Sequence, residues 1–168
     1  MTSTRSTIQS HIAENPGVYF SQIVRSLDLA PGQVQHHLRS LREDDDVIED
    51  SIRGYTHYYP ETYDGWERET LAFLRRETVR DILFVIIEEE PNANPVDITD
   101  ELGIARSTLE WHLDSLVDRD IVEKNREMGG GVGLSLSHPE RTHELLEEVS
   151  PSLSDRLTDR FIRAFDQI

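Results

Sequence analysis

The sequence contains an internal repeat, and this repeat constrains the fold more than any other feature. Residues 15–41 align without a gap to residues 90–116, an offset of 75 positions. Pro16 then pairs with Pro91, Ile23 with Ile98, and Leu38 with Leu113. The apolar positions match while most polar positions differ, as expected when one core is used twice beneath different surfaces. A repeat that occurs only twice predicts tandem domains rather than a solenoid.

Each copy has the same order of predicted elements. In the first copy, an apolar stripe predicts a helix up to residue 14, and Ser21 is expected to cap a second helix. Pro31 suits the first turn of a third helix, and strands follow over 47–52 and 55–59 around an Arg53–Gly54 turn. The second copy predicts helices over 78–89, 97–102 and 105–119, then strands over 122–126 and 132–137. The expected fold is therefore mainly α with small β-hairpins, in the α+β class.

Three segments carry a resemblance to a known family. They are the Asn15–Gly17 turn, the stretch Phe20–Leu41, and the related triplets His36–Leu38 and Trp111–Leu113. Over residues 4–60 and 78–138, both copies resemble the winged helix-turn-helix transcription regulators common in archaea. The resemblance implies a first winged unit at 1–60, a linker helix at 61–77, a second winged unit at 78–138 and C-terminal helices at 139–168.

The resemblance also implies double-stranded DNA and a second copy of the chain as partners. The C-terminal helices contain an amphipathic pattern that could form the homodimer interface, with Leu157, Phe161, Ile162 and Phe165 on one side. The alternative is that this helix covers its own domain.

The charge of the chain is strongly negative. It has 33 acidic against 17 basic residues, a net charge of -16, and Lys124 is its only lysine. This composition resembles that of a halophilic archaeal protein, whose carboxylates stay hydrated while salt screens their repulsion. The alternative is an acidic protein that avoids nucleic acid. The N-terminus lacks a signal-like apolar run and the stretch Ile82–Ile87 is too short to span a bilayer, so a cytoplasmic location without membrane contact is expected.

The third helix of the first copy carries the candidate DNA-reading surface. At 100° per residue, the face opposite Val34, Leu38 and Leu41 bears polar residues that can contact bases and phosphates. No acidic residue occurs between Asp28 and Glu43, so the face avoids the surrounding negative charge. We add two residues of the hairpin wing, and the candidate DNA-binding residues are Gly32, Gln33, Gln35, His36, Arg39, Ser40, Arg53 and His57.

The second copy differs at the same positions. Its third helix presents Glu110 and Asp114, which phosphates would repel, so this face is expected to meet protein or nothing rather than bases. Arg106, Ser107 and Thr108 remain secondary candidates for holding phosphates at the start of that helix. His37 and His112 are interpreted as partly buried packing residues.

The residues predict no catalysis, no cofactor and no metal site. The sequence has no cysteine, and the glycines at 129–131 lie in a hairpin without the lysine of a phosphate-binding loop. The leading hypothesis is a sequence-specific transcription regulator. The alternatives are an interaction scaffold in a transcription or chromosome complex, and a replication or partition accessory that binds DNA. A small-molecule effector remains unknown.

Overall fold

The computed structural model describes residues 2–149 and divides them into two compact units. The first unit comprises residues 2–72 with 145–149, and the second comprises residues 73–144. Both are mainly helical with a small antiparallel sheet, which confirms the predicted α+β class and the tandem winged units. The C-terminal amphipathic segment from Leu157 to Phe165 lies outside the described residues.

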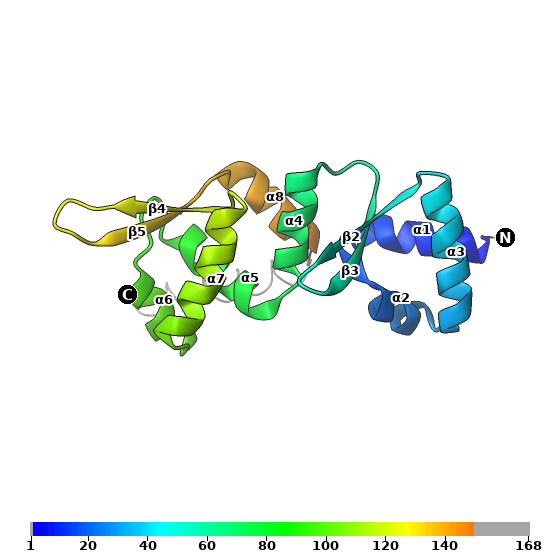
Figure 1. The fold of residues 1–168 in the computed structure, drawn as a ribbon, viewed down its shortest axis with the longest axis horizontal. Helices are drawn as coiled ribbons and strands as arrows, with labels where there is room; N and C mark the ends of the chain where they lie inside the picture. Colours follow the sequence, from blue (N-terminus) through cyan, green and yellow to red (C-terminus); the bar gives the residue numbers. More distant parts are fainter. Residues whose placement is uncertain (1, 150–168) are drawn as a thin grey trace, which may run out of the picture. The chain divides into compact units, whose positions relative to one another are not determined.

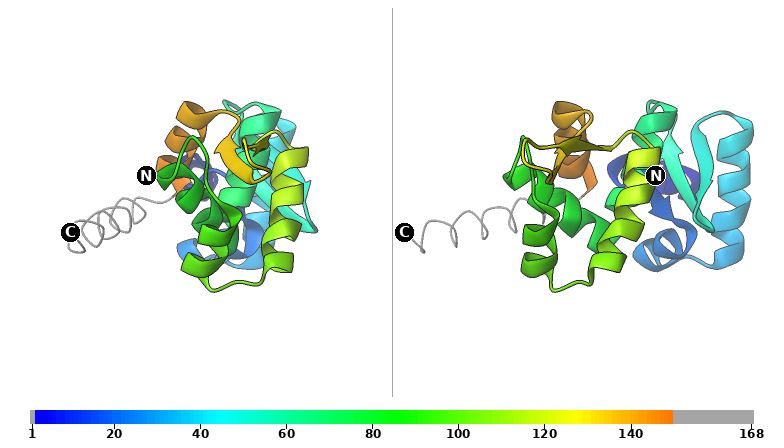
Figure 2. Two further views of the ribbon diagram at one scale, coloured as in Figure 1. Left: turned by 90° about the vertical axis from the view of Figure 1, so that its left-hand side faces the viewer. Right: turned by 60° about the vertical axis from the view of Figure 1, so that its left-hand side comes forward.

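The first unit has the element order of a winged helix (Figure 1). Helices α1 (Thr4–Glu14), α2 (Phe20–Leu27) and α3 (Pro31–Glu43) precede the hairpin of β2 (Val47–Ile52) and β3 (Tyr55–Pro60), and α4 (Gly65–Leu74) follows. A short strand that was not predicted, β1 (Val18–Tyr19), completes an antiparallel sheet of order β1-β3-β2. The sheet lies between α3 and α4 in the views of Figures 1 and 2.

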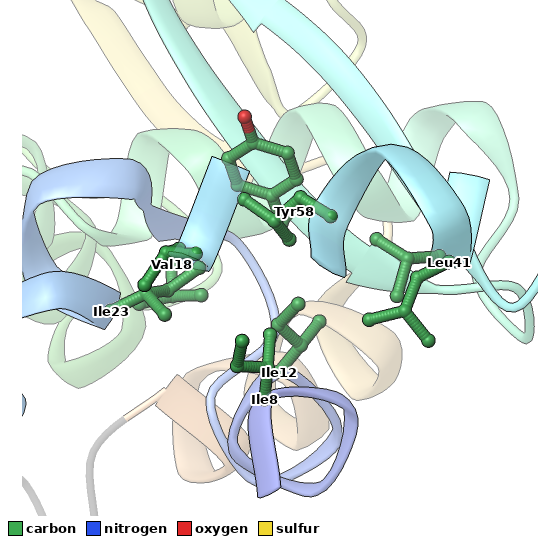
Figure 3. Packing of buried hydrophobic residues seen from close by; sticks show 9 residues of the cluster. Ile8, Ile12, Val18, Ile23, Leu41 and Tyr58 are labelled. Carbon is green, nitrogen blue, oxygen red and sulfur yellow. The ribbon is translucent and has the colours of Figure 1, made fainter. Parts of the chain in front are cut away.

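Apolar residues of α1, α2 and α3 meet in one core of the first unit (Figure 3). Ile8 and Ile12 of α1, Ile23 of α2, and Val34 and Leu41 of α3 are each 0% exposed. They belong to a cluster that also includes Val18, Leu38, Val47 and Tyr58. Because Val34, Leu38 and Leu41 recur at helical spacing, burying them turns the opposite face of α3 toward solvent.

The first unit shows local capping that partly differs from the prediction. Pro31 occupies the first turn of α3 as expected. The prediction that Ser21 caps the second helix is wrong, since α2 already begins at Phe20. The side chain of Gln22 instead accepts a hydrogen bond from the backbone N–H of Tyr19 at 3.1 Å.

Gly17 joins β1 to the rest of the sheet in a conformation that favours glycine. Its φ is +85°, and its N–H donates to the Tyr58 carbonyl at 2.8 Å. A Cβ at this position would lie 3.3 Å from a ring carbon of Tyr59 and 3.6 Å from Leu71 of α4. The Tyr59 hydroxyl also donates to the Arg68 carbonyl of α4 at 2.7 Å. Helix α4, which the sequence suggested as a linker, thus packs on the sheet of the first unit.

The second unit repeats the order of elements. It consists of α5 (Glu77–Glu88), α6 (Pro95–Leu102), α7 (Arg106–Asp118), the hairpin of β4 (Val122–Arg126) and β5 (Val132–Leu136), and the start of α8 (Pro139–Val149). Asn94 caps α6 by accepting from the Val96 N–H at 2.9 Å, and Gly103 ends this helix in the left-handed region. A bridge between Ala93 and Leu134 stands where the first unit has β1. The repeat in the sequence is therefore a repeat of the fold.

Candidate nucleic-acid interface

The outer face of α3 is the candidate interface of the first unit. The side chains of Gln33, Gln35, His36 and Arg39 are exposed, and Gly32 has nothing within 4 Å of a Cβ built on it. Ser40 differs, because it is half-buried and its hydroxyl accepts a hydrogen bond from Arg5 at 2.8 Å. The interface therefore centres on the first three turns of α3, and Ser40 serves in part to hold α1 against it.

The arginines of this unit differ in whether an acid already neutralises them. Arg5 pairs with Asp44 at 2.6 Å and Asp46 at 2.9 Å, and Arg68 pairs with Asp50 at 2.6 Å. Arg42 forms an ion pair with Glu49. In the part of the chain that the structure describes, Arg39 and Arg25 are exposed and make no ion pair with an acid. Arg39 is thus a cation on α3 that is available to an external anion.

A hollow of about 340 Å³ lies between α3 and the hairpin. Its lining comprises Phe20, Gln35, Leu38, Arg39, Arg42, Glu49, Thr56 and Tyr58. Figure 3 shows the Tyr58 ring packed on the core with its hydroxyl pointing away from the apolar cluster. Burial raises the pKa of this hydroxyl above its usual value, and the negative charge of Glu49 raises it further. The hydroxyl therefore stays protonated at neutral pH and adds no charge to the hollow.

The two wing residues named from the sequence lie in different surroundings. Arg53 sits at the hairpin turn with φ of +50° and is partly exposed. His57 is 0% exposed, and its Nδ1 lies 2.8 Å from the Gly17 carbonyl oxygen, to which it donates. Its ring also packs at 4.6 Å from that of Tyr19 on β1. This burial is at odds with the prediction that His57 contacts DNA, because β1 pairs with the edge of β3 and places Gly17 and Tyr19 beside the His57 ring.

The same region of the second unit is occupied by its own ion pairs. Glu110 of α7 accepts hydrogen bonds at 2.9 Å from both Lys124 on β4 and Arg106 one turn earlier. Lys124 also lies 3.9 Å from Asp114. The hydrogen bond from Lys124 lowers the pKa of the Glu110 carboxyl, burial opposes this, and the bond from Arg106 lowers it further. Arg106, a secondary candidate for phosphate binding, is therefore already paired, whereas Ser107 and Thr108 are exposed.

An aromatic side chain stands beside these pairs. Trp111 is 59% exposed, at the position where the first unit has His36. His112 and its counterpart His37 are half-buried, in agreement with their interpretation as packing residues. The outer face of α7 thus presents carboxylates, an indole and few available cations.

Sequence reasoning missed Arg42 and Arg25. Arg42 lies three residues after Arg39, a spacing that places both on one side of a helix and could have identified it. Arg25 is exposed in the last turn of α2, and nothing in its spacing distinguishes it from an ordinary solvated arginine.

Residues 2–149 contain neither a cluster of metal-ligating side chains nor a helix suited to a bilayer. Within that range no group of three or more metal-ligating side chains comes together. Among the same residues, no helix combines the length and the apolar character needed to cross a membrane.

Comparisons with known proteins agree with this architecture. Residues 2–71 match a family model described as an N-terminal helix-turn-helix domain, and residues 75–123 match one described as winged helix-turn-helix DNA-binding. No curated protein matches the chain. Among solved structures, the DIP2311 protein from Corynebacterium diphtheriae is 15% identical with a TM-score of 0.29, over 79% of this chain and 26% of that chain. The match spans about a quarter of that protein. The two family models identify two helix-turn-helix units in tandem in this chain, the second described as winged.

Proposed function

We propose that this protein, as a tandem of two winged helix-turn-helix units, is a sequence-specific DNA-binding transcription regulator whose α3 reads the major groove. The observation that carries the proposal is Arg39, an exposed cation that pairs with no acid among residues 2–149, on a face that also presents Gln35 and His36. Arginine and glutamine form bidentate contacts with guanine and adenine edges. Gly32 lets the start of α3 approach the duplex closely.

Other residues of the first unit contribute to position rather than to base reading. Gln33 flanks the reading face, and Arg53 at the hairpin turn is placed to contact a phosphate or the minor groove. Ser40 keeps α3 fixed against α1 through its hydrogen bond with Arg5. His57 is not part of the proposed surface.

The second unit has a different role in this proposal. Its α7 face carries Glu110 and Asp114 beside an exposed Trp111, and Arg106 and Lys124 are engaged with those acids. A face of this kind suits contact with protein better than contact with a polyanion. We assign homodimerisation to the second unit and the C-terminal segment 139–168, and the site of action to chromosomal DNA in the cytoplasm.

The test is selection of duplexes from genomic fragments by the full-length chain, followed by gel-shift titration at molar potassium chloride. High salt is needed because the net charge of -16 otherwise repels DNA. We expect enrichment of a defined site near promoters. Enrichment near replication origins would favour the replication or partition accessory, and failure to select any duplex would favour the interaction scaffold.

A further inference from the structure

The ion pair between Arg42 and Glu49 stands at the edge of the hollow in the first unit. Arg42 comes from α3, Glu49 comes from β2, and both line the hollow together with Arg39 and Thr56. The pair therefore spans the gap between the reading helix and the wing, where a strand of DNA backbone would run if α3 lay in the major groove.

The fold does not depend on this pair. The side chains of Arg42 and Glu49 are 42% and 33% exposed, and ion pairs so exposed contribute little to stability. The backbone of Glu49 is already held in register with Tyr58 by the β2–β3 ladder. The pair is thus free to exchange partners without unfolding the unit.

The second unit has an ion pair of opposite polarity at the same wing position. Glu49 and Lys124 are equivalent, because they are separated by the repeat offset of 75. Their partners on the third helix differ, since Lys124 pairs with Glu110, which corresponds to Gln35, whereas the equivalent of Arg42 is Val117. In the first unit the wing charge thus neutralises Arg42 and leaves Arg39 without an ion pair among the described residues.

We propose that the hollow is a subsite for a phosphate of the DNA backbone, and that Glu49 is the counter-ion that occupies Arg42 until the phosphate replaces it. The volume of about 340 Å³ admits a phosphate group, and Arg42 and Thr56 offer it hydrogen-bond donors, while Arg39 and Gln35 at the same hollow remain for the bases. This inference rests on the proposed function, since the phosphate is that of the bound duplex. Glu49 thereby weakens the binding of any duplex that has no phosphate positioned to replace the Arg42–Glu49 ion pair.

Three variants test the exchange on the duplex selected by the wild type. Glu49→Gln releases Arg42, and Glu43→Gln removes the same charge from an exposed acid at the end of α3 that makes no ion pair among the described residues. The double variant Arg42→Gln/Glu49→Gln keeps the net charge of the wild type and removes the arginine that would bind the phosphate.

One phosphate contact contributes about 0.9 to the slope of log K against log salt, which between 1 M and 0.2 M salt amounts to about fourfold in affinity. We expect Glu49→Gln to bind more tightly than Glu43→Gln at 0.2 M salt, because Arg42 no longer has to leave Glu49 before it meets the phosphate. The double variant lacks the arginine, so it should bind about fourfold more weakly than Glu49→Gln at 0.2 M salt and its slope should be smaller by about 0.9. Equal binding by Glu49→Gln and Glu43→Gln, or an unchanged slope in the double variant, would overturn the inference.

A second measurement separates this inference from the proposed function. Inorganic phosphate is titrated into Glu49→Gln while the side-chain N–H signals of Arg42 and Arg25 are followed by NMR. Arg42 should shift at lower phosphate than Arg25, which is exposed on α2 and lies outside the hollow. If the wild type binds no duplex, the proposed function fails and this titration still decides the subsite. Equal shifts of the two arginines would refute the subsite even if the wild type binds DNA.

Discussion

Replacing Arg39 by alanine removes the exposed guanidinium on which the proposed reading of DNA by α3 depends. Arg39 makes no ion pair among the described residues, and alanine has the higher helix propensity. The stability of the fold should therefore change by less than about 0.5 kcal/mol, as for other surface substitutions. Any larger effect on DNA binding then reports a lost contact rather than a damaged unit.

The size of the loss follows from the kind of contact. A bidentate contact between arginine and guanine contributes about 1–3 kcal/mol of discrimination against the wrong base. Since about 1.4 kcal/mol corresponds to tenfold, Arg39→Ala should weaken binding to the selected site by about fivefold to 150-fold. Binding to unrelated duplexes should weaken much less, so the ratio of specific to non-specific affinity falls.

Fluorescence anisotropy at fixed salt measures both affinities, with two controls. Arg25→Ala removes the same charge from α2 and should weaken specific and non-specific binding about equally. Asp114→Ala changes the equivalent position of the second unit, where the side chain is 74% exposed, and should change affinity by less than about twofold. Equal losses for Arg39→Ala and Asp114→Ala would refute the assignment of DNA reading to the first unit. An unchanged specificity ratio in Arg39→Ala would refute base contact by this residue.

Two further predictions concern the fold and the ion pairs of the second unit. Gly17→Ala places a Cβ at φ of +85° and 3.3 Å from the Tyr59 ring, so it should lower the free energy of unfolding by about 1–3 kcal/mol in urea titrations. Gly32→Ala adds a Cβ to a helical residue with open space around it, so it should leave the free energy of unfolding unchanged or raise it by up to about 1 kcal/mol. A loss for Gly32→Ala as large as that for Gly17→Ala would contradict the packing described for β1. The lowered pKa of Glu110 means that its ion pairs stabilise the fold above the unfolded pKa, near 4.3, and lose that contribution as pH falls through the lower folded pKa. An NMR titration should show the Glu110 midpoint rising in Lys124→Gln, and an unmoved midpoint would show that Lys124 does not cause the shift.

The sequence alone determined the architecture and the orientation of the third helix. The repeat at an offset of 75 indicates two copies of one fold. Within the first copy, helical periodicity places Val34, Leu38 and Leu41 opposite Gln35, His36 and Arg39. Helical periodicity is a local property, so burial of one stripe fixes which residues face solvent. This is why the exposure of the α3 face could be predicted from residues close together in the chain.

The tertiary structure decided which of these residues are available. Arg42 and Glu49 meet across the turn between α3 and β2, and Glu110 and Lys124 meet across the corresponding turn of the second unit. His57 contacts Gly17 and Tyr19, which lie 40 and 38 positions earlier, because β1 pairs with the edge of β3. These ion pairs and this burial depend on contacts between segments that lie far apart in the sequence. Helical or strand periodicity does not relate such segments, so only the folded chain shows these features.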